Sequence, residues 1–92
     1  MDDLLLSEIR LAAIAELLRS ESVTFASMQK SISTSNGNLG AHLAKLVAAG
    51  YVSEEKTFVN RRPQTRYRLT SLGRGAFKIH VRQLQGLLKA AR

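Results

Sequence analysis

The spacing of apolar residues in the first half of the chain predicts three helices. In residues 7–20, apolar side chains recur at helical intervals after Ser7, which is a suitable N-cap. Residues 24–32 have apolar positions at i, i+3 and i+7, and residues 35–49 form a longer stripe that ends before Gly50, a typical left-handed C-cap. The apolar positions of these helices are Leu11, Ile14, Leu17, Leu18, Phe25, Met28, Ile32, Leu39, Leu43, Leu46 and Val47.

After Gly50 the pattern changes to one typical of strands. Residues 51–59 are rich in β-branched and aromatic side chains, and residues 65–69 alternate with a period of two. The segment between them, residues 60–64, contains two arginines and the only proline of the chain, which at a tip breaks no ladder hydrogen bond. We therefore predict a two-stranded hairpin with a basic tip at residues 60–64. Residues 23–25 also fit a very short strand.

A last helix is predicted from Leu72 to about Ala91, capped by Thr70. Its apolar residues cover more than one stripe, and three leucines precede the first helix, so the chain has more apolar surface than one small core covers. We expect this surplus to form a dimer interface, although the terminal helix wrapping its own domain is the alternative. The expected interface residues are Leu4, Leu5, Phe77, Val81, Leu84 and Leu88.

The order of helix, helix, helix, hairpin, helix defines the expected fold class. Residues 33–35 form a turn short enough to join two helices into a helix-turn-helix, and the hairpin follows directly. We expect a mainly α (α+β) winged helix with a three-helix core, a two-stranded wing and a long C-terminal helix. The expected boundaries are one domain over residues 1–92, with an N-terminal segment and helix at 1–22, the helix-turn-helix at 24–49, the wing at 51–69 and the terminal helix at 71–91.

The distribution of charge favours a polyanionic partner. The net charge is +7, but residues 1–55 hold all seven acidic residues and only four of the fourteen lysines and arginines, a net −3. Residues 56–92 hold the other ten basic residues and no acid, a net +10. Such asymmetry is typical of a chain that meets nucleic acid, although a solvated surface would also account for it.

Composition argues against several other classes. Cysteine is absent, which excludes disulfides, thiolate metal sites and cysteine nucleophiles. The two histidines, His42 and His80, are far apart in sequence, and no glycine-rich phosphate loop precedes a helix. We therefore expect no enzyme activity, no metal and no cofactor. No apolar run reaches membrane-spanning length, so a cytoplasmic protein without a membrane partner is expected.

Residues 25–70 resemble the winged-helix regulators related to the MarR and ArsR families. The run NLGAHLAKL (residues 38–46) is similar to their recognition helix, GYV (residues 50–52) to its exit into the wing, and LTSLG (residues 69–73) to the motif that closes the wing. The resemblance implies sequence-specific binding of double-stranded DNA by a homodimeric transcriptional regulator. Metal sensing is not implied, because the cysteines of ArsR-type sensors are missing. The acid that often precedes the MarR wing arginine is also missing.

The candidate DNA contacts lie on the third helix and the wing. Asn38, Ala41 and Lys45 fall opposite the leucine stripe, where asparagine can pair with an adenine edge, alanine permits close approach and lysine reaches guanine or phosphate. The full helix set is Ser35, Asn36, Asn38, Ala41, His42 and Lys45. Guanidinium groups suit phosphates and narrow minor grooves, and the wing set is Arg61, Arg62, Gln64 and Arg66. A solvated helix face and a solvated wing are the simpler alternatives.

Two other functions stay open at this point. The same core occurs in protein–protein interaction modules, although a basic wing argues against one, and the net charge also permits RNA binding. A small-molecule effector also stays open, although the sequence does not indicate one.

Overall fold

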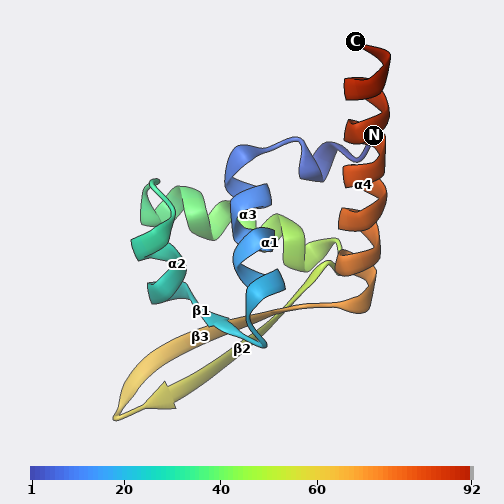
Figure 1. The fold of residues 1–92 in the computed structure, drawn as a ribbon. Helices are drawn as coiled ribbons and strands as arrows, with labels where there is room; N and C mark the ends of the chain where they lie inside the picture. Colours follow the sequence, from blue (N-terminus) through green and yellow to red (C-terminus); the bar gives the residue numbers. More distant parts are fainter. Residues whose placement is uncertain (92) are drawn as a thin grey trace.

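The computed structural model describes residues 1–91 and sets four α-helices around a small antiparallel sheet (Figure 1). The predicted order of elements and the winged-helix class are confirmed. A 3₁₀ turn at Asp3–Leu5, which the sequence patterns had not indicated, precedes the first helix. The elements are α1 (Glu8–Arg19), β1 (Val23–Thr24), α2 (Phe25–Ser31), α3 (Asn36–Ala48), β2 (Val52–Val59), β3 (Arg62–Leu69) and α4 (Ser71–Ala90).

Each α-helix follows a hydroxyl residue that caps it, and two of these caps, Ser7 and Thr70, are those that the sequence predicted. Ser7, Thr24, Ser35 and Thr70 each accept a hydrogen bond from the backbone N–H three residues later, at 3.0–3.2 Å. Gly50 follows the C-terminal end of α3 with φ of 79°, in the left-handed region that favours glycine. Local capping chemistry therefore determines where these helices begin and where α3 ends.

The sheet has the order β1-β3-β2, and the wing is the long β2–β3 hairpin. Its ladder runs from Val52 opposite Leu69 to Val59 opposite Arg62. The connecting loop is only Asn60 and Arg61, with φ of 51° and 65°, as in a type I′ turn. The predicted tip over residues 60–64 is therefore wrong. Asn60 tolerates a tight turn, and Pro63 joins β3 beyond the two residues that pair with β1, where its missing N–H breaks no ladder bond.

The hydrophobic core lies among α1, α2, α3 and the base of the sheet. Leu5, which we predicted at a dimer interface, is fully buried in this core. That prediction is contradicted for the isolated chain, because the 3₁₀ turn, capped by Asp2, folds Leu5 inward. The buried residues are Leu5, Ala13, Ile14, Leu17, Val23, Met28, Ile32, Leu39, Leu43, Leu46, Val52 and Tyr67.

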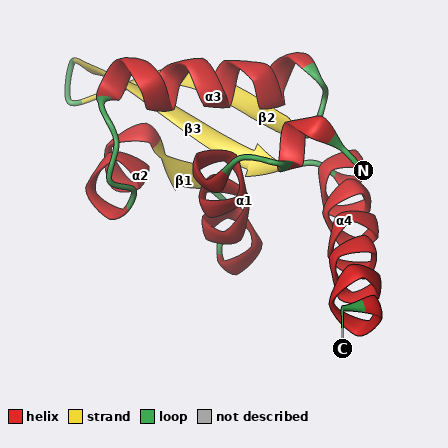
Figure 2. Cartoon of the chain, turned by 90° about the horizontal axis from the view of Figure 1, so that it is seen from above, coloured by secondary structure: helices red, strands yellow, loops and turns green. Residues whose placement is uncertain are grey.

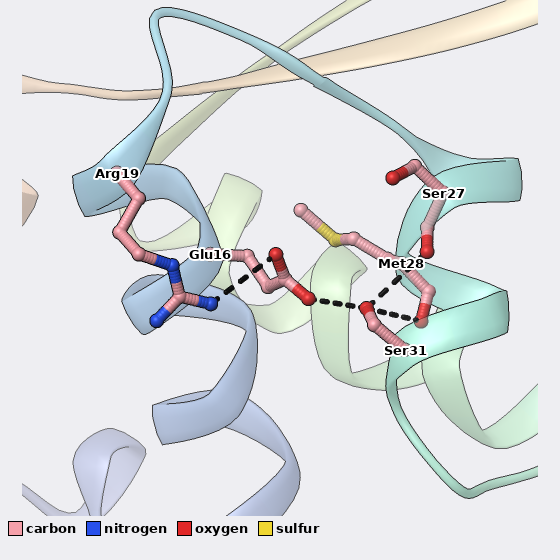
Figure 3. Close-up of polar contacts among 5 residues, drawn as sticks. All are labelled: Glu16, Arg19, Ser27, Met28 and Ser31. Carbon is pink, nitrogen blue, oxygen red and sulfur yellow. Dashed lines mark hydrogen bonds and ion pairs between the residues drawn. The ribbon is translucent and has the colours of Figure 1, made fainter.

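Polar contacts tie the end of α2 to α1 (Figure 3). The Ser31 hydroxyl donates to the Glu16 carboxylate and also lies 3.2 Å from the carbonyl oxygen of Ser27. Glu16 pairs in turn with Arg19 at 3.5 Å on the same helix. Because α2 has only seven residues, these contacts help to set its orientation beneath α3.

The LTSLG motif joins the wing to the last helix through the end of α3. The Thr70 hydroxyl, besides capping α4, donates to the carbonyl oxygens of Gly50 and Tyr51, which lie 2.6 and 3.0 Å away. A Cβ at Gly73 would lie 2.1 Å from the carbonyl oxygen of Tyr51, so only glycine fits there. Thr70 and Gly73 thus explain why this motif closes the wing.

Helix α4 leaves the body of the molecule in both views (Figures 1 and 2). Its only buried residues are Gly73 and His80, both in its first half. Beyond them, Leu84, Leu87 and Leu88 are 37%, 57% and 69% exposed. From Arg82 onward, every residue of α4 is therefore exposed in the protomer. None of the helices within residues 1–91 combines the length and hydropathy needed to cross a membrane.

Candidate nucleic-acid interface

Helix α3 buries one face and leaves the opposite face to solvent. Leu39, Leu43 and Leu46 are fully buried, whereas all of the predicted base-contacting residues on the far side are exposed. We call this exposed set, Asn38, Ala41 and Lys45, the recognition face. Ser35 and Asn36 at the start of the helix are exposed as well, with the Ser35 hydroxyl engaged in the cap.

Asn38 is held in place at both its backbone and its side chain. Its N–H donates to Ser35, and its side-chain Nδ2 donates to the Thr34 hydroxyl at 2.7 Å. The second hydrogen on Nδ2 and the amide oxygen are left to pair with a base edge. The sequence analysis missed Thr34. The signal that could have found it is its place in the turn before α3, four residues before Asn38.

His42 differs from the rest of the predicted helix set. It is half-buried, and its Nδ1 lies 2.8 Å from Nη1 of Arg10 on α1. A guanidinium can only donate, so Nδ1 accepts and the imidazole is neutral. Burial, followed by the charges of Arg10 and Lys45, lowers the pKa of His42. His42 therefore braces α3 against α1, which leaves only its Nε2 for another partner. The sequence patterns had not indicated Arg10.

Arg61 and Arg62 lie at the end of the wing and are exposed. Neither forms an ion pair with any group in residues 1–91. In both views the wing tip and the N-terminal end of α3 point to the same side of the molecule, away from α4 (Figures 1 and 2). The start of α3 and the wing tip, with its two unpaired guanidinium groups, thus lie on one side of the molecule.

The base of the wing uses its arginines differently. The ladder places Arg62, Gln64 and Arg66 on one face, as strand alternation predicted. Arg66, however, donates to the Ser22 hydroxyl at 2.8 Å, and Arg68 pairs with Glu21 at 3.3 Å. These two side chains fasten β3 to the turn before β1, and of the predicted wing set Gln64 and Arg66 are half-buried.

The part of the chain that the structure describes contains no cluster of three or more metal-ligating His, Asp or Glu side chains. The arrangement offers exposed hydrogen-bond donors, an amide and cations. It is suited to contact a polyanion.

Comparison with known proteins identifies the same class. Residues 9–88 match the profile of the family described as winged helix DNA-binding domain. An uncharacterized protein of Methanocaldococcus jannaschii is 31% identical over 83 residues, which cover 90% of each chain.

Solved structures agree on the fold. The structure of a transcriptional regulator homologue protein from Pyrococcus horikoshii is similar with a TM-score of 0.86 and 26% identity, over 96% of this chain and 87% of that one. PadR of Bacillus subtilis, solved in complex with operator DNA, shares the fold with a TM-score of 0.72 and 15% identity, over 82% of this chain and 48% of that one. Both similar structures are of transcriptional regulators, not enzymes. The match over residues 9–88 and the shared arrangement of helices and wing make this chain a member of the winged helix DNA-binding domain family.

Proposed function

We propose that this protein regulates transcription by binding a specific double-stranded DNA sequence as a homodimer. Helix α3 enters the major groove, and the wing contacts the backbone or the minor groove. The observation that carries the proposal is the exposed recognition face on α3, a helix whose N-terminal end lies on the same side of the molecule as the wing tip. We also assign the chain to the MarR- and ArsR-like regulators, because Thr70 and Gly73 of the LTSLG motif make specific structural contacts.

The conformation of Arg61 supports a role for the wing tip. A side chain in the left-handed region strains the backbone, and the second position of a type I′ turn favours glycine. The fold alone gives no reason for an arginine there. A contact with a phosphate or the minor groove would explain the arginine, because the turn places Arg61 at the exposed tip of the wing.

The exposed C-terminal end of α4 supports the homodimer. Leu84, Leu87 and Leu88 form an exposed apolar surface that a second copy covers, whereas Phe77 and Val81 are half-buried in the protomer and Leu4 is half-buried near its start. Two-fold pairing through α4 sets two recognition helices about 34–36 Å apart, one turn of DNA, on a roughly palindromic site. We also propose that this regulator acts in the cytoplasm.

Selection of bound sequences from random duplexes tests the proposal directly. A specific regulator enriches a roughly palindromic sequence and binds it about 10³–10⁷ times more tightly than random duplex. Competition between that duplex and a structured RNA at one salt concentration separates DNA binding from RNA binding. A lack of enrichment together with no binding of random duplex would instead favour a protein-interaction module.

A further inference from the structure

The wing carries an exposed aromatic side chain close to its tip. Phe58 is 76% exposed, more than any other large apolar side chain in the part of the chain that the structure describes. The residue directly opposite it in the hairpin is Pro63, which is exposed as well. We call Phe58 and Pro63 the wing-tip apolar pair. Adjacent exposed apolar side chains at the end of an arm indicate a surface that another molecule covers.

The protomer itself leaves the wing-tip apolar pair open. β1 pairs with Arg66 and Tyr67 of β3, so the hairpin beyond these residues consists of two strands alone. The proposed dimer contact does not reach the pair either, because the wing tip points away from α4 in both views (Figures 1 and 2). The covering surface therefore belongs to a partner that the wing meets.

The charge around the pair defines the chemistry of this partner. From Lys56 to Arg66 the wing has four basic residues and no acid. Arg61 and Arg62, next to the pair, form no ion pair with any group in residues 1–91. The partner thus presents negative charge and apolar surface close together. Duplex DNA does so, since its phosphates flank a groove at whose floor lie the edges of stacked bases.

The position of the pair suits the minor groove. Phe58 and Pro63 form the second cross-strand pair from the two-residue loop, so they lie roughly 7 Å behind the tip. The minor groove is about 7.5 Å deep but only about 6 Å wide. A hairpin with strands about 4.8 Å apart and side chains on both faces is too broad for it. The groove must therefore open before the wing can enter.

Apolar wedges open a minor groove in this way. Phenylalanine and proline are among the side chains that insert between base pairs, partly unstack them and kink the duplex by about 20–90°. A wing that only followed the phosphates would need its arginines and would give an exposed phenylalanine no role. The wing-tip apolar pair and the unpaired arginines together favour insertion into the groove.

We propose that Phe58 is a wedge that enters the DNA minor groove and partly unstacks one base-pair step beside the sequence that α3 contacts. Pro63 supports the ring, and Arg61 and Arg62 contact the flanking phosphates. This inference rests on the proposed function and deepens it, since it selects the minor groove for the wing and adds a bend in the DNA. The step is a flexible pyrimidine–purine step such as TA or CA, because these unstack most easily.

Two matched substitutions separate the wedge from a role of Phe58 in the strand. Isoleucine and threonine are both β-branched and both suit a strand, but only isoleucine is an apolar wedge. Energy transfer between dyes at the two ends of the selected duplex measures bending. 2-Aminopurine placed at successive flanking positions measures unstacking, because its fluorescence rises when it leaves the stack.

The wild type and Phe58→Ile should bend the duplex by about 20° or more and raise the fluorescence at one flanking step. Phe58→Thr should leave the duplex nearly straight and bind it about 10-fold more weakly. Its salt slope should equal that of the wild type, because no charge is removed. Thermal unfolding of both variants should match the wild type, since Phe58 is exposed.

Val59→Thr is the control for the site. Val59 is adjacent to Phe58 and 45% exposed, but strand alternation places it on the other face of the hairpin. This variant should keep both the bend and the rise in fluorescence. Equal straightening by Val59→Thr and Phe58→Thr would show that the wing acts through its general shape, which overturns the wedge.

Three further results would overturn the proposal. They are a straight duplex in the wild-type complex, a full bend with Phe58→Thr, and a loss of affinity in Phe58→Thr with bending unchanged. The last result would assign Phe58 to a contact outside the base stack. A wild type that binds no duplex at all would contradict the proposed function too, so the two failures are distinguishable.

Discussion

The guanidinium of Arg10 on α1 lies 2.8 Å from Nδ1 of His42 on α3 and also donates through Nε to the carbonyl oxygen of Leu4. One side chain therefore connects the N-terminal segment, the first helix and the recognition helix. The connection requires a neutral His42. Protonation would place two cations side by side and remove the acceptor.

Acidification should weaken the fold through His42. Its pKa in the folded state lies below the ordinary value of 6.5. At a pH between these two pKa values, the folded chain therefore holds fewer protons than the unfolded chain. The contribution of His42 to stability is complete above pH 6.5 and is lost as the pH falls through the folded pKa. Urea titrations at several pH values measure it. His42→Gln should remove this pH dependence, and an unchanged dependence in that variant would assign it to other groups.

Replacing Arg61 should separate wing stability from DNA affinity. Arg61→Gly relieves the left-handed strain and should raise the free energy of unfolding by about 1 kcal/mol. It should also lower DNA affinity and reduce the slope of log K against log salt by about 0.9, because one phosphate contact is lost. Arg62→Ala should flatten the slope without stabilising the chain. Unchanged slopes in both variants would remove the wing from the interface.

Asn38 should contribute to sequence discrimination. Asn38→Ala is expected to lose roughly 1–3 kcal/mol on the selected sequence and little on random duplex. Thr34→Val removes the hydroxyl that holds Asn38 but leaves the amide, so a smaller loss is expected from it. Fluorescence anisotropy with both duplexes at one salt concentration measures these losses. Equal losses on both duplexes would mean that Asn38 only positions the protein.

The unpacked leucines of α4 should hold two chains together. Leu87 is 57% exposed in the protomer, so Leu87→Glu should leave the fold intact and yield a monomer. Gln85→Glu adds the same charge on the opposite side of α4 and should remain dimeric. Sedimentation equilibrium distinguishes the two states. A wild-type monomer at concentrations on the order of tens of micromolar would contradict the dimer.

Two glycines of α4 that lie two residues apart should respond in opposite directions. Gly73→Ala places a Cβ 2.1 Å from the Tyr51 carbonyl oxygen and should destabilise the chain by about 1–3 kcal/mol or more. Gly75→Ala meets no neighbouring atom and should stabilise α4 by up to about 1 kcal/mol through helix propensity. Thermal unfolding of both variants checks this. Similar melting temperatures would show that the backbone at Tyr51 can shift to accommodate a Cβ at position 73 at little cost in free energy.

The sequence alone determined those features that depend on neighbours in the chain. Hydroxyl caps at Ser7, Thr24, Ser35 and Thr70 set the helix starts, and apolar periodicity set the buried faces, because both act within a few residues. The order of elements and the recognition face followed from these local rules. The wing tip was misjudged because Asn60 and Arg61 make a turn that usually calls for glycine.

Only the tertiary structure decided which distant groups meet. Arg10 reaches His42 across 32 residues of sequence, and Arg66 reaches Ser22 across 44. These contacts assign bracing roles to side chains that local patterns placed at the DNA. The buried side chains of Leu5 and His80 are further cases, because burial depends on the packing of whole elements. Periodicity shows which face of a helix is apolar, whereas the three-dimensional arrangement determines what covers that face.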